Sequence, residues 1–157
     1  MSVSQVKEYL RPFGLEDRVQ EFEVSSATVA LAAQALGCAE QRIAKTLSFL
    51  VDGAPVLIVA AGDARIDNPK FKAQFAAKAK MLTPEQVQSL VGHAVGGVCP
   101  FAVKEGVRVF LDRSLCRFET VFPACGSSSS AIEMTLPELE QTSKAEGWID
   151  VCKGWMS

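Results

Sequence analysis

The amino-acid sequence predicts an α/β domain with a mixed β-sheet surrounded by helices. One observation is the hairpin signal Asp52-Gly53 between two apolar runs, which predicts a pair of antiparallel strands. The other is that the later strands are separated by helical segments, an order typical of α/β folds with parallel pairing. A mixed sheet of this kind can also curl into a barrel. The length of 157 residues suits a single domain over residues 1–157.

The N-terminal half is predicted to form two helices followed by the hairpin. Pro12 and Gly14 stop the first helix, Ser25-Ser26 can cap the second, and Gly37 ends it. We expect the second helix to be buried because it is rich in Ala, Val and Leu, and the run PVLIVAA predicts a buried central strand. The helices are expected over residues 3–10 and 27–36, and the strands over residues 43–51 and 55–61.

The C-terminal half is predicted to alternate helices with strands. Asp67 or Asn68 caps the first of these helices, and capping boxes that begin at Thr83 and Thr135 start the next two. The helices are expected over residues 67–78, 83–91 and 135–145, and the strands over residues 107–111, 119–124, 131–134 and 148–152.

Composition and charge exclude several classes of protein. No run approaches the ~20 apolar residues that cross a bilayer, and the N-terminus lacks an apolar core of signal-peptide type. We therefore expect a cytoplasmic protein with no membrane partner. A net charge of −2 does not suit a protein that coats nucleic acid, so we expect no DNA partner. It does allow an enzyme that grips only the end of an RNA.

The cysteines and the single histidine predict neither a disulfide framework nor a metal centre. The five cysteines are odd in number, and no two stand in C-x-x-C spacing. We therefore expect no metal site and no cofactor. Cys99 and Cys125 are expected to be small buried residues rather than nucleophiles, because the sequence pairs neither with a histidine. His93 is expected to be a surface or hydrogen-bonded residue.

The strand over residues 43–51 carries a lysine in its apolar row. Side chains alternate along a strand, so Lys45 shares one face with four apolar residues, and the opposite face carries small and hydroxylated residues. The apolar residues of that row are Ile43, Leu47, Phe49 and Val51. A buried, unpaired ammonium costs on the order of several kcal/mol. Lys45 therefore either extends its charge to water or directs it into a cleft.

Two loops are candidates for contact with a ligand. Residues 96–101, GGVCPF, are either a plain turn or a stretch of bare backbone that a ligand can approach closely, because glycine has no Cβ. Residues 126–130, GSSSS, are either a flexible hairpin or a source of hydroxyl and amide groups. A serine nucleophile is not expected there, because it needs a base and His93 gives no sign of being near.

Three motifs occur together in one known family. They are the run AKTLSF over residues 44–49, the GGVCPF loop, and a glycine-containing turn before Ile132-Glu133. With them the chain resembles the YbaK/ProX family of aminoacyl-tRNA deacylases, whose domain also occurs as the editing insertion of bacterial prolyl-tRNA synthetases. The resemblance covers nearly the whole chain. It implies a single domain with a mixed, barrel-like sheet, and hydrolysis of the ester between a wrong amino acid and the terminal adenosine of tRNA, without a metal.

The resemblance also implies a role for each motif. Lys45 is the expected catalytic residue, a cation that faces residues 96–100 and binds the 3′-terminal phosphate or stabilises charge on the ester carbonyl. The loop backbone is expected to hold the terminal adenosine, whose ribose hydroxyl then orients water. The residues expected to bind substrate are Gly96, Gly97, Pro100, Gly126, Ser127, Ser128 and Ser129.

The identity of the substrate is only partly implied. A synthetase pocket for proline cannot firmly reject a smaller amino acid, so a second hydrolytic site completes a double sieve. We expect tRNA for proline carrying alanine first, then cysteine or serine, with prolyl-tRNA synthetase as a further partner. Many members have a Gly-Gly-basic-x-Gly turn and a polar residue before Ile-Glu, whereas this chain has serines and Ala131 there. This departure leaves the amino acid open.

Two other functions stay open. One is a module that binds tRNA ends or nucleotides without cleaving them, and the other is a partner protein that docks on a synthetase. Asp112 is expected to fix Lys45 or a loop. Lysines 70, 72, 78 and 80 do not share one face of the predicted helix, so contact with tRNA phosphates and simple solvation fit equally well.

Overall fold

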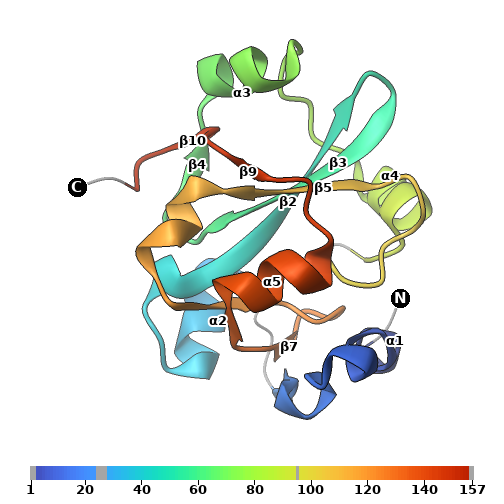
Figure 1. Cartoon of the computed structure of the whole chain (residues 1–157), viewed down its shortest axis with the longest axis vertical. Helices are drawn as coiled ribbons and strands as arrows, with labels where there is room; N and C mark the ends of the chain where they lie inside the picture. Colours follow the sequence, from blue (N-terminus) through green and yellow to red (C-terminus); the bar gives the residue numbers. More distant parts are fainter. Residues whose placement is uncertain (1–2, 24–27, 95, 156–157) are drawn as a thin grey trace.

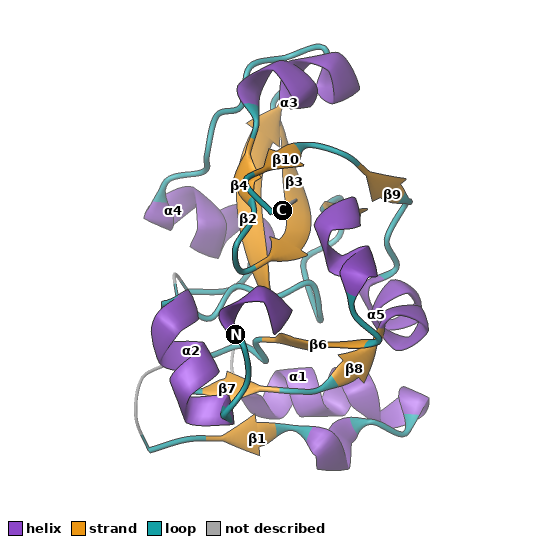
Figure 2. Ribbon diagram, turned by 90° about the vertical axis from the view of Figure 1, so that its left-hand side faces the viewer, coloured by secondary structure: helices purple, strands orange, loops and turns teal. Residues whose placement is uncertain are grey.

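The computed structural model describes residues 3–23, 28–94 and 96–155, and a curled sheet of six strands lies at its centre (Figures 1 and 2). The strands are β2 (Ile43–Val51), β3 (Ala54–Ala61), β5 (Arg108–Asp112), β6 (Thr120–Pro123), β8 (Met134–Thr135) and β9 (Trp148–Ile149). Their order across the sheet is β8-β6-β2-β3-β5-β9. The β2–β3 and β6–β8 pairs are antiparallel and the other three are parallel. This mixed, curled sheet confirms the predicted fold class.

The β2–β3 hairpin confirms the turn and the central strand predicted from the sequence. Asp52 and Gly53 both have positive φ, 50° and 77°, as a two-residue turn between twisted strands requires. The turn sets the register in which Val51 faces Ala54. β3 is covered on both faces, and its residues 56–61 are at most 1% exposed.

Helices surround the sheet, with α3 beyond one end and α1 at the opposite end of the molecule (Figures 1 and 2). They are α1 (Val3–Leu10), α2 (Val29–Leu36), α3 (Asn68–Phe75), α4 (Pro84–Gln86) and α5 (Leu136–Ser143), and a π-helical turn, Val87–Val91, continues α4. The bounds of α1 and both capping boxes, at Thr83 and Thr135, are confirmed. None of the helices in the described ranges combines the length and apolar character that crossing a membrane needs.

α2 differs from its prediction at its start and in its burial. Thr28 caps it by accepting a hydrogen bond from the backbone N–H of Leu31, whereas the expected cap Ser25-Ser26 lies outside the described residues. Only Ala32 and Ala33 of α2 are buried, and Leu31 is 43% exposed. The expectation of a fully buried helix was therefore wrong, because apolar composition alone does not show which faces a helix covers.

α3 is shorter than predicted. It begins after the Asp67 cap, as expected, but ends at Ala76, whose φ of 55° is left-handed. The chain beyond it runs extended, and residues 80–82 pair with the edge of β2, where Leu50 N donates to Lys80 O over 2.8 Å. The helix therefore ends early although its sequence favours a longer one. The residues after it satisfy backbone groups on the edge of β2 that would otherwise be unpaired.

Two predicted strands near the C-terminus are each split in two. The segment 131–134 becomes β7 (Ser130–Ala131), which pairs with β1 (Gln20–Glu21), and β8 in the main sheet. The segment 148–152 becomes β9 in the main sheet and β10 (Cys152–Lys153), which pairs with β4 (Arg65–Ile66). Each segment passes from one sheet to another, and no local sequence pattern marks such a crossing.

The core joins α3 to the sheet through aromatic side chains. The ring centroids of Phe49 and Phe71 lie 4.9 Å apart, those of Phe71 and Phe75 4.7 Å, and those of Phe75 and Phe110 5.3 Å. Such tilted and edge-on contacts add to the stabilisation that burial gives. These contacts fix α3 against the sheet although the helix is shorter than predicted.

One glycine of the fold has no room for a side chain. A Cβ built on Gly62 would lie 2.0 Å from the carbonyl oxygen of Glu40 and 2.7 Å from a methyl group of Val29. We predict that Gly62→Ala lowers the free energy of unfolding by about 1–3 kcal/mol, because backbone must shift to admit the methyl group.

Gly147→Ala is the matched control for this test. A Cβ on Gly147 would have nothing within 4 Å, so its effect should stay within about 0.5 kcal/mol. Urea unfolding of the two variants measures both. Equal stability of Gly62→Ala and wild type would contradict the packing described around Gly62.

Candidate active site

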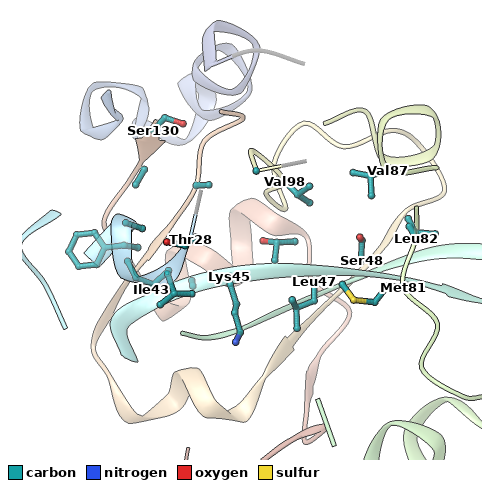
Figure 3. Close-up of a pocket in the computed structure, with 18 of the residues that line it drawn as sticks. Thr28, Ile43, Lys45, Leu47, Ser48, Met81, Leu82, Val87, Val98 and Ser130 are labelled. Carbon is teal, nitrogen blue, oxygen red and sulfur yellow. The ribbon is translucent and has the colours of Figure 1, made fainter. Parts of the chain in front are cut away.

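A gap along one edge of β2 creates a pocket. On this edge β6 pairs with residues 43 and 44, and residues 80–82 pair with residues 48–50. Between these two pairings, residues 45–47 have no strand partner on that edge among the described residues. A pocket of about 420 Å³ lies over this gap (Figure 3). Its volume suits a small ligand or one end of a larger one.

The pocket is lined mostly by apolar side chains, with a few hydroxyl groups. The apolar residues come from α2, β2, β6, residues 81–87, Val98 and the two alanines that flank the serine turn, and the hydroxyl groups come from Thr28, Thr46, Ser48 and Ser130. An apolar wall with a few polar groups is the usual composition of a site that orients a ligand.

The alternation of side chains along β2 divides the residues beside the pocket. Ser48 points to the side where Val87 and Val98 lie, and Lys45 and Leu47 point to the other side (Figure 3). Thr46 shares the face of Ser48 by alternation. The Oγ1 atom of Thr46 is buried and has no hydrogen-bond partner among the described residues. The floor of the pocket thus holds a hydroxyl whose hydrogen-bonding capacity the protein leaves unused.

Lys45 lines the pocket, but its amine does not face the glycine loop. The amine donates to the carbonyl oxygens of Gly62, at 3.3 Å, and Ala64, on the side of β2 away from Val98 (Figure 3). Burial is the main cause that lowers the pKa of the half-buried Lys45. The expected placement of the charge facing residues 96–100 was therefore wrong, because the turn after β3 offers carbonyl groups that the sequence does not reveal. The catalytic role of Lys45 stays a prediction.

The two loops expected to bind substrate pack against each other. A Cβ on Gly97 would lie 2.7 Å from both the backbone nitrogen and the Cα of Ser127, so only glycine allows this approach. Gly96, with a φ of 92°, lines the pocket. Gly97 thus brings residues far apart in the sequence together at the rim, as the grouping of the motifs implies.

The serine turn is held by hydrogen bonds among its own residues. The Ser127 hydroxyl donates to the Ser130 hydroxyl over 2.9 Å, and the Ser129 backbone N–H donates to the Ser127 hydroxyl over 3.2 Å. Such bonds fix the turn instead of leaving it as a flexible hairpin. Ser130, which lies outside the predicted set of binding residues, is the serine that lines the pocket.

Of the eight residues predicted for the site, Lys45 and Gly96 line the pocket. The other six lie around it without lining it: Gly97, Pro100, Gly126, Ser127, Ser128 and Ser129. Sequence reasoning missed Thr46, Ser48 and Met81. The alternation of side chains along β2 could have indicated Thr46 and Ser48, because it sets both hydroxyls on one face. Met81 could not be predicted in this way, because its position depends on the early end of α3.

Cys99 and His93 form a buried pair away from the pocket lining. The Cys99 Sγ lies 3.5 Å from His93 Nε2, which also lies 2.8 Å from the carbonyl oxygen of Phe101. Burial raises the pKa of Cys99 to about 12 and lowers the pKa of His93. The thiol therefore stays protonated, and the prediction that Cys99 is a small buried residue is confirmed, although a histidine does stand beside it.

Lys78 and Lys80 point outward from the extended segment that leads to the pocket. They alternate with Ala77 and Ala79, which pack against the core, so the two lysines share one side of the chain. The helix assumed from the sequence had set them on different faces. Within the described residues no ion pair engages either lysine, and Met81 at the pocket follows directly.

The described residues do not gather three His, Cys, Asp or Glu side chains into a group that could hold a metal ion. Asp112 is fully buried and accepts hydrogen bonds from the backbone N–H groups of Ser114, at 2.9 Å, and Val151, at 3.0 Å. It fixes loops, which is one of its two expected roles.

Comparison with known proteins places this fold and pocket in a family. Residues 23–142 match the aminoacyl-tRNA editing domain. The chain therefore belongs to the aminoacyl-tRNA editing domain family. It is 53% identical over 156 residues to the uncharacterized protein YwhH of Bacillus subtilis (strain 168), covering 99% of each chain.

Two further similar proteins are described by names that refer to the charging of tRNA with proline. The chain is 28% identical over 116 residues to a proline–tRNA ligase of Streptococcus equi subsp. equi (strain 4047), covering 73% of this chain but only 19% of the ligase. A solved structure described as "a putative trans-editing enzyme for prolyl tRNA synthetase" superposes with a TM-score of 0.88 at 29% identity, covering 98% of this chain and 99% of that one. The chain thus resembles a whole protein of that kind and about a fifth of the ligase.

The burial of the thiols predicts how they react. With an excess of a disulfide reagent at pH 8, we expect the exposed Cys116 and then the partly exposed Cys38 to react in the native protein. The buried Cys99, Cys125 and Cys152 should react only on unfolding, because burial raises the pKa of each. Spectrophotometric thiol counts with and without urea measure this. Rapid labelling of Cys99 in the folded protein would contradict its assigned burial.

Proposed function

We propose that this protein is a trans-editing deacylase that hydrolyses the ester of a mischarged tRNA. The observation that carries the proposal is that Lys45 and Gly96 line one pocket in a chain of the editing-domain family. A lysine that can turn toward bare backbone suits the end of a nucleic acid, which carries phosphate and ribose hydroxyl groups.

In this proposal the protein positions the ester and stabilises charge. The Gly96 backbone holds the ribose of the terminal adenosine, and the free ribose hydroxyl orients the attacking water. The Lys45 amine leaves the carbonyls of Gly62 and Ala64 and turns round the unpaired edge of β2 toward the 3′-terminal phosphate or the developing oxyanion. The orphan hydroxyl of Thr46 lies next to this path.

The substrate we propose is tRNA for proline carrying a small wrong amino acid. Alanine comes first, followed by cysteine and serine, because the lining is largely apolar and carries only small hydroxyl groups. A pocket that accepts these and rejects proline removes the errors that a synthetase cannot exclude by affinity alone. The likeness to a proline–tRNA ligase and to a trans-editing enzyme supports this choice, with prolyl-tRNA synthetase as a proposed partner.

The test is hydrolysis of a panel of misacylated tRNAs by wild type and Lys45→Ala. We expect the alanyl ester on tRNA for proline to be cleaved fastest, and Lys45→Ala to slow it on the order of 100-fold. Lys72→Ala is the control, because Lys72 is an exposed lysine that does not line the pocket. Equal rates for wild type and Lys45→Ala would remove Lys45 from catalysis.

A second function, binding without cleavage, has one observation in its favour. The described residues that line the pocket include no histidine, aspartate or glutamate that could act as a general base. Tight binding of a non-hydrolysable aminoacyl-adenosine, with no turnover of any tRNA in the panel, would favour this binding module over the deacylase.

Lys78 and Lys80 are proposed to contact phosphates of the bound tRNA upstream of its 3′ end. Removal of one lysine–phosphate pair should lower the salt dependence of binding, the slope of log K against log salt, by about 0.7 for a single strand. We predict that Lys78→Ala and Lys80→Ala each weaken binding of an amide-linked aminoacyl minihelix and flatten this slope.

Lys7→Ala is the matched control for these lysine variants. Lys7 lies on α1 at the far end of the molecule and pairs with Glu21 over 3.1 Å (Figure 1). Its removal should leave the slope unchanged. Fluorescence anisotropy at several salt concentrations measures the slopes, and an unchanged slope for both Lys78→Ala and Lys80→Ala would exclude this path for the RNA.

A further inference from the structure

The turn that holds the Lys45 amine contains a carboxylate that is bound elsewhere. Lys45 donates to the carbonyl oxygens on either side of Asp63, those of Gly62 and Ala64. The Asp63 carboxylate instead accepts two hydrogen bonds from the guanidinium of Arg117, at 3.0 and 2.5 Å. The Lys45 ammonium from β2 and the Asp63 carboxylate thus meet at one turn without pairing.

Arg117 is held in place by more than Asp63. Its guanidinium also donates to the carbonyl oxygens of Ser114, at 3.0 Å, and Trp155, at 2.9 Å. It stacks over the rings of Phe118, at 4.8 Å, and Trp155, at 5.2 Å. A planar guanidinium fixed on all these sides presents a rigid fork to the carboxylate.

The backbone of the turn is fixed as well. The Ala61 N–H donates to the Ser114 hydroxyl over 3.0 Å, and the Ala64 N–H closes the turn on Ala61 O over 3.0 Å. Gly62 is pressed against the backbone of Glu40. The carbonyl groups that accept from Lys45 therefore cannot move freely. The Asp63 side chain, in contrast, can rotate between Arg117 and Lys45.

The charges that act on the Lys45 amine are few. Burial acts most strongly and lowers the pKa of Lys45, whereas the neighbouring Cys152 and Asp63 act to raise this pKa and Arg65 acts to lower it. Among the described residues no carboxylate lies within ion-pair distance of the amine. A carboxylate released beside the amine would form an ion pair with it, an attraction between full opposite charges that a neutral carbonyl does not offer.

We propose that Arg117 is a positioning residue that withholds the Asp63 carboxylate from Lys45. The amine then rests on two neutral carbonyl groups, which an anionic group of the substrate can displace. Without Arg117, Asp63 turns to the amine and holds it in an internal ion pair. This inference rests on the proposed function, because it explains the Arg117–Asp63 pair by the proposed role of Lys45 in deacylation.

A double-mutant cycle tests the inference. Arg117→Met keeps an apolar stem against Phe118 and Trp155 while it removes the charge, and Asp63→Asn removes the competing carboxylate. We expect Arg117→Met to slow deacylation about 10-fold or more, since displacing a reacting group is costly. Asp63→Asn should remain within a few-fold of wild type, and the double variant should recover to the level of Asp63→Asn.

A second readout does not depend on activity. NMR of lysines labelled with ¹³C at Cε, which leaves every amine unmodified, gives the pKa of the Lys45 amine, whose signal is assigned by its loss in Lys45→Arg. We expect this pKa to rise by about one unit in Arg117→Met and to return in the double variant, because an adjacent carboxylate favours the charged form. Arg108→Met is the matched control: Arg108 forms a similar two-bond pair with Glu146 and stacks on Phe110, away from the pocket.

The outcomes separate this inference from the proposed function. An unchanged Lys45 pKa in Arg117→Met, or a double variant as slow as Arg117→Met, overturns the inference, since a merely structural loss would not be rescued by Asp63→Asn. If the Lys45 pKa rises in Arg117→Met and returns in the double variant, but wild type cleaves no tRNA, the role of Arg117 is supported and the deacylase proposal is wrong. Urea unfolding of all variants shows whether a lost activity reflects lost folding.

Discussion

The buried carboxylate of Asp112 is the interaction on which the arrangement around Lys45 depends. It ends β5 with no exposed surface and accepts backbone hydrogen bonds from Ser114 and Val151. The first bond orients Ser114, whose hydroxyl receives the Ala61 N–H at the start of the turn that holds Lys45. The second ties the C-terminal strands to the sheet. A buried polar group is tolerated where hydrogen-bond partners satisfy it in this way, so the Asp112 side chain enforces the local geometry.

The pocket follows from an interruption in the pairing of β2. Neighbouring chain covers this edge on both sides of residues 45–47, by β6 and by residues 80–82, but not in between. The early end of α3 matters here, because it frees residues 77–82 from the helix and the last three of them pair with residues 48–50. The same segment brings Met81 to the pocket and sets Lys78 and Lys80 on one side of the chain.

Local patterns in the sequence were enough for the hairpin, the caps at Asp67, Thr83 and Thr135, and the two faces of β2, because each depends on neighbours within a few residues. The alternation even separated Lys45 from Thr46 and Ser48 correctly. What the sequence could not provide are contacts between distant segments: Asp63 with Arg117, Gly97 with Ser127, and Cys99 with His93 across a fold in the loop. The direction of the Lys45 amine depends on such contacts, because its partners are backbone carbonyls that carry no residue-type signal.

The chemistry available to this site is narrower than its residue content suggests. The thiol with a histidine beside it, Cys99, is buried with its pKa raised to about 12, so it offers no thiolate to an ester. The hydroxyls of Ser127 and Ser130 bond to each other, and no histidine, aspartate or glutamate is among the described residues that line the pocket beside Ser130. What remains at the pocket is a glycine backbone and the unused hydroxyl of Thr46, while the Lys45 amine rests on neutral carbonyls on the other side of β2. These groups can hold a substrate and stabilise charge, and no general base stands beside them among the described residues that line the pocket, so they fit the proposed direct attack of water better than a covalent route.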